Sequence, residues 1–208
     1  MRSSCAPYKG CKKGGKKDNY NREAVAVISE NNNGITGNVL FKQTSSSSKK
    51  LKIKYEIYGL TDGKHGFHIH EYGDLTDGCK SACSHFKPTK NSIRRADLYS
   101  SGSMTDKDRN SSPKGANLNL KRLNPFGKNH GNHAGDLGNV ISKNGISKGV
   151  IYSKILSLNF SDPTCIVGRM IIVHKDEDDL GLGDNEESLI TGNAGERVAC
   201  GVIGLKHA

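Results

Sequence analysis

Residues 51–74 read LKIKYEIYGLTDGKHGFHIHEYGD and contain two β-rich runs, 51–60 and 66–72. In the second run, His68 and His70 stand two positions apart, so on a strand both side chains project from the same face. Two imidazoles placed in this way can reach one metal ion. This stretch therefore predicts a strand that serves a metal site as well as a sheet.

Short β-rich runs bounded by turn residues recur along the rest of the chain, whereas helical periodicity is scarce. The connections at 31–34, 45–48, 143–145 and 161–163 hold residues that tolerate turn geometry. This pattern is typical of an antiparallel sandwich or barrel, and it predicts an all-β protein. The predicted strands are 24–29, 37–43, 51–60, 66–72, 138–142, 149–156, 166–174 and 198–205.

The length of 208 residues suits one domain, but only 34% of the residues are hydrophobic and the mean hydropathy is −0.60. Part of the chain is therefore expected to lie outside the core. No stretch reaches the roughly 18 apolar residues of a membrane helix, and residues 1–20 lack the apolar segment of a secretion signal. Membrane spanning and classical secretion are both disfavoured, and we expect a cytoplasmic protein.

The net charge of +10 is concentrated in two segments. Residues 1–22 carry seven Lys and Arg against one Asp, and residues 87–123 carry nine against three acidic residues, so each segment has a net charge of +6 and the rest carries −2. Both segments lack a helical or strand period. We expect a disordered basic tail, 1–22, and a domain at 23–208 with a basic insertion at about 87–123. Two interpretations of these segments stay open: solvated mobile sequence, or binding to nucleic acid or an anionic surface.

Seven of the eight histidines fall into a few clusters. The glycine-rich segment 130–136 adds the imidazoles of His130 and His133 and the carboxylate of Asp136, and it can bend around a cation. Three histidines with one aspartate are an ordinary zinc set. A set of imidazoles alone suits copper, whose affinity is the highest of the divalent series. The spacing therefore predicts a metal protein, with His68, His70, His85 and His174 as such an imidazole set.

Four motifs follow one another along the chain: HGFHIHEYGD at 65–74, GDLGN at 135–139, VHKDEDDLG at 173–181 and TGNAGERVACG at 191–201. Together they resemble copper/zinc superoxide dismutase, and the resemblance runs from about residue 24 to 205, interrupted by the insertion. It implies an eight-stranded Greek-key barrel, an immunoglobulin-like sandwich with long metal-binding and electrostatic loops. It also implies copper and zinc as cofactors, and the dismutation of superoxide to dioxygen and hydrogen peroxide.

The resemblance also assigns the metal ligands. The copper ligands would be the four histidines of the imidazole set, and the imidazolate of His85 would bridge copper to zinc and take up a proton during the reaction. His130, His133 and Asp136 would complete the zinc site, since no other histidine lies between His85 and Asp136. Asp178 resembles the carboxylate that orients a ligand histidine of each metal.

Further family features are implied outside the ligand set. Cys79 and Cys200 match the family disulfide, and Arg197 matches the arginine that attracts the substrate anion beside copper. Cys83 and Cys165 match no family role. A homodimer is expected, because residues 72–74, 168 and 202–205 resemble the apolar patches of the family's two-fold contact. Relatives commonly place lysines in the loop 181–191, where this chain has Leu182 and Ile190 and keeps two glutamates, so we expect weaker attraction of superoxide there unless the basic insertion compensates.

Two other functions stay open. A copper-delivery module with the same fold would carry a metal-binding cysteine motif and lack one copper ligand, whereas this chain has all four histidines and no such motif. Nucleic-acid binding through the basic tail and insertion is the less favoured possibility, and it is compatible with catalysis.

Overall fold

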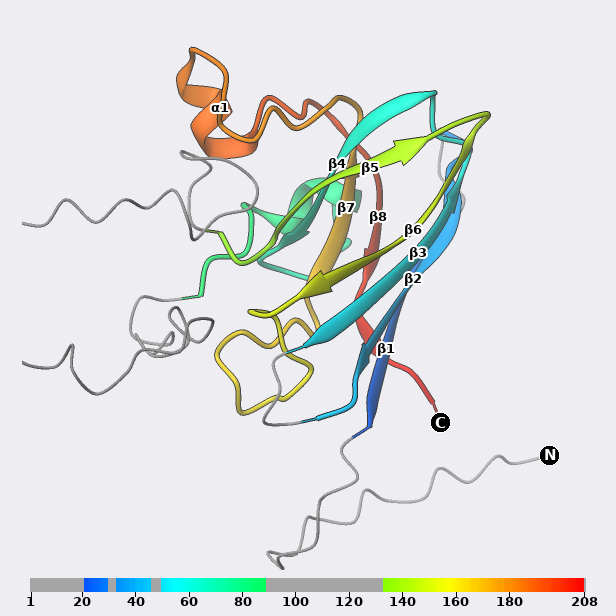
Figure 1. Cartoon of the computed structure of the whole chain (residues 1–208), viewed down its shortest axis with the longest axis vertical. Coiled ribbons are helices and arrows are strands. Elements are labelled where there is room, and N and C mark those ends of the chain that lie inside the picture. Colours follow the sequence, from blue (N-terminus) through cyan, green and yellow to red (C-terminus); the bar gives the residue numbers. More distant parts are fainter. Residues whose placement is uncertain (1–20, 30–32, 46–49, 89–132, 208) are drawn as a thin grey trace, which may run out of the picture.

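The computed structural model describes residues 21–29, 33–45, 50–88 and 133–207, which form two antiparallel sheets that face each other (Figure 1). The first sheet consists of β1 (Arg22–Ile28), β2 (Thr36–Gln43), β3 (Leu51–Tyr58), β6 (Ile146–Ser153) and β9 (Gly204–Leu205), in the order β6-β3-β2-β1-β9. The second consists of β4 (Gly63–His70), β5 (Asp136–Ser142), β7 (Met170–His174) and β8 (Arg197–Val202), in the order β5-β4-β7-β8. The predicted all-β class is confirmed.

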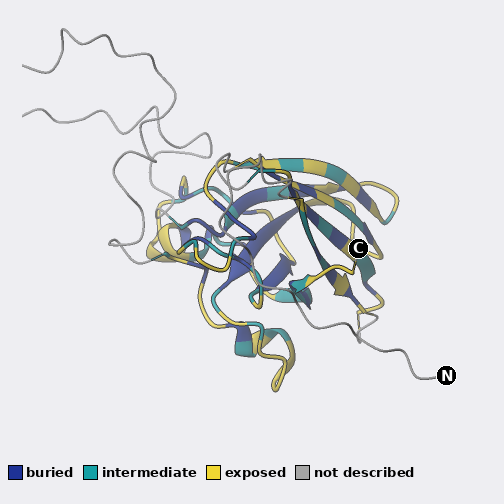
Figure 2. Cartoon of the chain, turned by 90° about the horizontal axis from the view of Figure 1, so that it is seen from below, coloured by how far each residue is buried: buried dark blue, intermediate teal, exposed yellow. Residues whose placement is uncertain are grey.

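The first sheet has the alternating pattern of a half-buried sheet. In β3, Leu51, Ile53 and Ile57 are fully buried, whereas Lys52 and Lys54 between them are exposed. Side chains alternate between the faces of a strand, so one face of β3 packs on the core and the other faces water. Figure 2 shows the same division as buried and exposed stripes along the strands.

The second sheet is buried on both faces at its centre. Every residue of β7 is buried, and β4 is buried from His65 to His70. Phe67 and Ile69 belong to the main hydrophobic core between the sheets. Because side chains alternate, His68 and His70 project to the opposite face, which the long connections cover. The sequence pattern therefore places the paired histidines beneath the loops and not in the apolar core.

The described residues contain nine strands where eight were predicted. The predicted strand 198–205 is two strands, because the chain leaves the second sheet after Val202 and Leu205 then pairs with Ala24 of β1. The predicted strand 166–174 begins only at Met170, since the preceding residues turn at Gly168, where φ is +84°. The strand predicted at 149–156 begins earlier, at Ile146.

Two short helices lie in the long connections, and neither was predicted. They are η1 (Gly78–Ala82) and α1 (Glu186–Thr191). The side chain of Asn185 accepts a hydrogen bond from the amide of Ser188, and Gly192 ends α1 with a φ of +68°. These are ordinary helix-capping residues, so the sequence did hold a signal for α1. No helix among the described residues has the length and apolar character needed to cross a membrane.

Residues 1–20 of the predicted basic tail and most of the predicted basic insertion lie outside the described residues, and so does His130. The predicted tail boundary at residue 22 is wrong, because Arg22 is the first residue of β1 and pairs with Gln43 of β2.

Candidate metal centre

Long-range pairing of the second sheet brings the histidines together. His68 lies opposite Ile172 in the β4–β7 ladder, two positions from His174 at the end of β7. His85 comes from the connection after η1 and forms an isolated bridge with His70. The amide of Phe86 donates to the carbonyl of Ile69 at 2.8 Å, and this bond fixes the segment along the end of β4.

Four of these histidines form one compact group, whose members are His68, His70, His85 and His174. One ring nitrogen from each lies within 4.8 Å of the others, and all four residues are buried. Within the described part of the chain, the Nε2 atoms of His70, His85 and His174 have no hydrogen-bond partner. Buried polar atoms without a partner are costly, and a cation bound between them would satisfy their lone pairs. The group therefore fits a metal ion.

The opposite ring nitrogens are held by fixed acceptors. His70 Nδ1 donates to the carbonyl of Cys83 at 2.8 Å, and His174 Nδ1 donates to the carbonyl of Gly195 at 3.0 Å. His68 Nε2 lies 2.8 Å from Oδ2 of Asp178. A proton held on one ring nitrogen leaves the lone pair on the other nitrogen, so these contacts select the tautomers that can bind a metal.

Burial keeps these imidazoles neutral. It lowers the pKa of His70 to about 2 and that of His174 to about 3, and it lowers the pKa of His68 as well. Neutral imidazole is the form that binds metals. At neutral pH, therefore, protons do not compete with a metal ion for these three imidazoles.

A second group shares His85 with the first. It consists of His85, His133 and Asp136. His85 Nδ1 lies 2.7 Å from Oδ1 of Asp136, and His133 Nδ1 lies 3.2 Å from Oδ2 of the same carboxylate. His85 thus directs Nδ1 to this group and Nε2 to the other three histidines. Two imidazoles and a carboxylate suit zinc.

Asp178 is buried and held from several sides. Its Oδ1 accepts a hydrogen bond from the amide of Leu180 at 2.8 Å, while Oδ2 faces His68. The side chain of Asn139, on β5, bonds the backbone of Asp178 at both the amide and the carbonyl, each at 2.8 Å. Sequence reasoning missed this role of Asn139, although the residue lies in the quoted motif at 135–139. Asp178 is therefore a fixed acceptor that orients His68.

Arg197 lies at the start of β8 and joins this strand to the η1 segment. Its guanidinium donates to the carbonyls of Cys79 at 2.8 Å and Lys80 at 3.0 Å, and also to that of Cys83. Partial burial lowers the pKa of Arg197, although the group stays charged at neutral pH. The carbonyl of Cys83 thus accepts hydrogen bonds from both His70 and Arg197.

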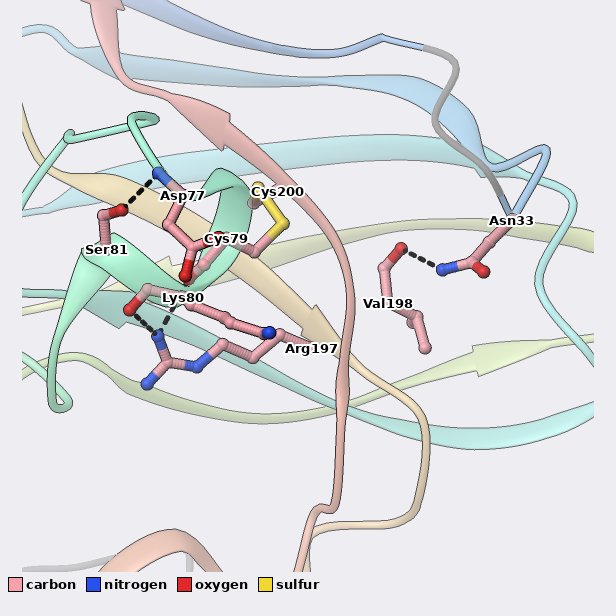
Figure 3. Close-up of a disulfide and its surroundings, with 8 residues drawn as sticks. All are labelled: Asn33, Asp77, Cys79, Lys80, Ser81, Arg197, Val198 and Cys200. Carbon is pink, nitrogen blue, oxygen red and sulfur yellow. Dashed lines mark hydrogen bonds between the residues drawn. A yellow bond between two sulfur atoms is a disulfide. The ribbon is translucent and has the colours of Figure 1, made fainter.

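The predicted disulfide between Cys79 and Cys200 is present beside Arg197 (Figure 3). It ties η1 to β8, so the loop that delivers His85 is attached covalently to the sheet. Cys83 and Cys165 are free thiols.

Sequence reasoning also gave no role to His65, which the structure places under His174. Nδ1 of His65 lies 3.0 Å from the carbonyl of His174, and Nε2 lies 2.9 Å from the carbonyl of Thr61. This buried side chain therefore connects the backbone of a candidate ligand to the β3–β4 connection.

Comparisons with known proteins agree with this geometry. The family model described as copper/zinc superoxide dismutase (SODC) matches residues 35–112 and 98–203. A protein named superoxide dismutase [Cu-Zn] from Saccharomyces cerevisiae is 41% identical over 187 residues, which cover 89% of this chain and 99% of the yeast protein. One of the same name from Paramecium bursaria Chlorella virus 1 is also 41% identical, over 87% of this chain and 77% of the viral protein. An extracellular superoxide dismutase [Cu-Zn] from Onchocerca volvulus is 36% identical, over 92% of this chain and 80% of that protein. By the family model and by its identity to these relatives, this chain belongs to the copper/zinc superoxide dismutase family.

Proposed function

We propose that this protein converts two superoxide anions and two protons into dioxygen and hydrogen peroxide at a copper centre joined to a zinc site through His85. One observation carries the proposal: the two ring nitrogens of His85 face two different ligand groups. We assign copper to His68, His70, His85 and His174, and zinc to His85, His133 and Asp136 together with His130.

Bound copper supplies the one-electron exchange with superoxide. The chain contributes the rest of the chemistry. Nε2 of His85 can take up a proton and release it to the forming peroxide, while Nδ1, which faces Asp136, would be held by the zinc that both residues share. The guanidinium of Arg197 attracts and orients the anionic substrate, and Asp178 holds His68 in its orientation.

Metal analysis paired with a superoxide-decay assay tests this proposal. We expect about one copper and one zinc per chain, and activity that is lost on copper chelation. His174→Ala should lose copper and activity while circular dichroism shows the native fold, because the disulfide and the zinc ligands remain. His207→Ala is the matched control, since that histidine is exposed near the end of the chain. Full activity of His174→Ala would refute the copper assignment.

The zinc assignment has its own test. Asp136→Ala should lose zinc but retain copper, because Asp136 belongs only to the second group. Loss of both metals to the same extent would argue against two separate sites.

Neither alternative function gains support from the site. A delivery module is disfavoured because the imidazole set is complete and buried. Nucleic-acid binding would depend on the basic tail and insertion, which lie largely outside the described residues. An electrophoretic shift assay tests it, and deletion of residues 1–22 should leave most of the dismutase activity, since that segment holds no proposed ligand.

We also propose a homodimer. Tyr72 and Leu205 are 58% and 51% exposed, and a depression of about 440 Å³ nearby is lined by Val25, Val27 and Leu75. Ile203, named above in the apolar patch 202–205, is fully buried in the core and cannot take part. Light scattering should give twice the chain mass, and Leu205→Arg should weaken the association. A monomer at micromolar concentration would contradict this proposal.

A cytoplasmic location stays a prediction. The family does not decide it, since one relative is named an extracellular enzyme. Cell fractionation with an antibody to the protein would decide it.

A further inference from the structure

The connection between β6 and β7 closes one end of the first sheet. One row of register partners runs across β1, β2, β3 and β6 at that end, and it consists of Arg22, Gln43, Leu51 and Ser153. The amide of Leu158 donates to the side-chain oxygen of Gln43 at 2.7 Å, and the guanidinium of Arg22 donates to the carbonyl of Leu158 at 2.9 Å. The connection therefore crosses the end of the sheet from β6 to β1. Figure 1 shows it in yellow at the lower end, with α1 at the upper end.

This end of the sheet exposes apolar side chains that do not close the core. Leu156 and Leu158 are fully buried and belong to the main hydrophobic core. Ile155 and Phe160 of the same connection are 45% and 61% exposed, and Tyr152, near the end of β6, is 56% exposed. Large apolar side chains that gather at one exposed place mark an interaction site more often than singly scattered ones do.

Cations lie beside these apolar side chains. The guanidinium of Arg22 is 5.6 Å from the centre of the Phe160 ring, and Nζ of Lys50 is 5.0 Å from the centre of the Tyr152 ring. Lys52 is exposed and lies opposite Tyr152 in the β3–β6 ladder. The charged heads thus stand next to exposed rings. We call this set the basal surface, and it consists of Arg22, Lys50, Lys52, Tyr152, Ile155 and Phe160.

The positive charge of the basal surface is not balanced by nearby carboxylates. Lys52 lies directly opposite Lys42 in the β2–β3 ladder, an arrangement of like charges that is unfavourable. Glu23 is shared between Lys42 and Lys206, at 2.8 and 3.1 Å. Asp162 accepts two hydrogen bonds within its own loop. No carboxylate in the described part of the chain pairs with Lys52. An anionic partner would relieve this repulsion.

The chain that precedes the basal surface carries further positive charge. Residues 1–20 hold six Lys and Arg against one Asp, a net charge of +5, and they join the described chain directly before Arg22. A partner that attracts the basal surface therefore also attracts this segment.

The mixture of apolar and cationic side chains favours one class of partner. A second copy of the chain placed on this surface through a two-fold contact would bring like cations together. A single-stranded nucleic acid stacks its bases on free aromatic faces, whereas Arg22 and Lys50 lie over the rings here and Ile155 offers no ring. An anionic lipid surface uses both kinds of side chain, because its headgroups attract cations and its interface takes up aromatic and aliphatic groups.

We propose that the basal surface binds the face of an anionic phospholipid bilayer. Phe160, Ile155 and Tyr152 enter the headgroup region, and the cations contact lipid phosphates and carboxylates. None of these six residues belongs to either metal-ligand group, so the proposal does not depend on the dismutase function.

Cosedimentation with vesicles tests the proposal on the copper- and zinc-loaded full chain. The vesicles consist of phosphatidylcholine alone or of an equal mixture with phosphatidylserine, and only the mixed vesicles should bind the wild type. Lys52→Gln should weaken this binding about fivefold at low salt, and the loss should shrink toward 1 M salt, where the Debye length is about 3 Å. Phe160→Ser should weaken binding about tenfold, and this loss should persist as salt is raised, because salt does not screen apolar burial.

Two matched controls lie at the other end of β6. Lys143 and Ile141 are exposed residues of the β5–β6 hairpin, at the end where Lys143 forms a bridge with Ile146. Lys143→Gln and Ile141→Ser should bind mixed vesicles like the wild type. Circular dichroism of all four variants should show the native fold, because each changed side chain is exposed.

Insertion has a separate readout. The chain contains no tryptophan, so Phe160→Trp introduces a single fluorescent reporter. Its emission should shift to shorter wavelengths with mixed vesicles, since the ring leaves water. The emission of Ile141→Trp should stay unchanged.

The possible results separate the partners. If Lys52→Gln and Phe160→Ser both bind mixed vesicles as tightly as the wild type, the basal surface is not the binding site and the proposal is wrong. If Phe160→Trp sediments with vesicles without a shift in emission, the contact is electrostatic only and the proposed insertion is refuted. Binding of the wild type to a fluorescent single-stranded oligonucleotide but not to vesicles would identify nucleic acid as the partner instead. Failure of the dismutase assay would leave each of these results unaffected.

Discussion

Replacement of Cys83 by glycine is predicted to stabilise the protein. The backbone of Cys83 has φ +62° and ψ −144°, a region that is occupied almost only by glycine. A residue with a Cβ held in such a region costs on the order of 1–3 kcal/mol, and the greater freedom of glycine in the unfolded chain offsets about 0.5–1 kcal/mol of the gain. The expected net gain is therefore about 1 kcal/mol, or about 2–4 °C in Tm for a chain of this size.

The surrounding contacts explain why the chain keeps this conformation. The carbonyl of Cys83 must point at both His70 and Arg197, and the side chain itself is exposed, so its removal leaves no cavity. Thermal unfolding of the metal-free, disulfide-bonded protein is the assay, with Cys83→Ala as the control that loses the thiol but keeps the Cβ. The alanine variant should melt close to wild type. A glycine variant that melts at or below the alanine variant would show that the backbone at residue 83 is not strained.

Three further predictions concern stability and rate. The folded-state pKa values of His70 and His174, about 2 and 3, lie below the ordinary 6.5, so protons bind the unfolded chain preferentially. The free energy of unfolding of the metal-free protein should therefore decrease as the pH is lowered from 7 to 5, by about 2 kcal/mol per histidine. Urea titrations at pH 5, 6 and 7 measure this decrease, and equal stabilities at the three pH values would contradict it. Cys200→Ser should lower the free energy of unfolding by about 4–5 kcal/mol in the chain-entropy model, because the disulfide to Cys79 spans a sequence separation of 121. Chemical denaturation under non-reducing conditions measures this loss. Ile190→Lys should raise the dismutation rate at low salt only, and an unchanged low-salt rate would show that α1 lies too far from the path of the substrate.

The sequence allowed the sheets to be predicted because their signal is local. Alternation in β3 and the spacing of His68 and His70 each follow from the two-residue period of a strand. The predicted strand ends were less accurate where a contact with another strand determines the end. The chain crosses to the other sheet after Val202, and only the pairing with β1 reveals that crossing.

The candidate site was predictable from the sequence only in part, for a related reason. No spacing by itself brings His85 to His70, since that contact depends on a bridge between a loop and the end of β4. The sequence offered His85 as one member of a histidine set, and the family resemblance supported that choice. The roles of Cys83 and Gly195 are carried by their carbonyl groups, which every residue possesses. Such contacts do not depend on the residue type, so the sequence does not indicate them. Asn139 is different, because its side chain contributes, yet asparagine does not indicate a metal enzyme by itself.

The site also explains why so much of its surroundings is rigid. Several neutral imidazoles are buried with one nitrogen bonded to a fixed acceptor, so the protein bears the cost of their desolvation before any metal binds. Metal binding recovers that cost only if the free lone pairs of the imidazoles point at one ion. Imidazoles that were free to rotate would form hydrogen bonds with other partners. The hydrogen bonds to Asp178 and to the carbonyls of Cys83 and Gly195 prevent that rotation. The disulfide and the sheet in turn hold these acceptors, so the stability lost at the metal centre is offset by covalent and packing interactions outside it.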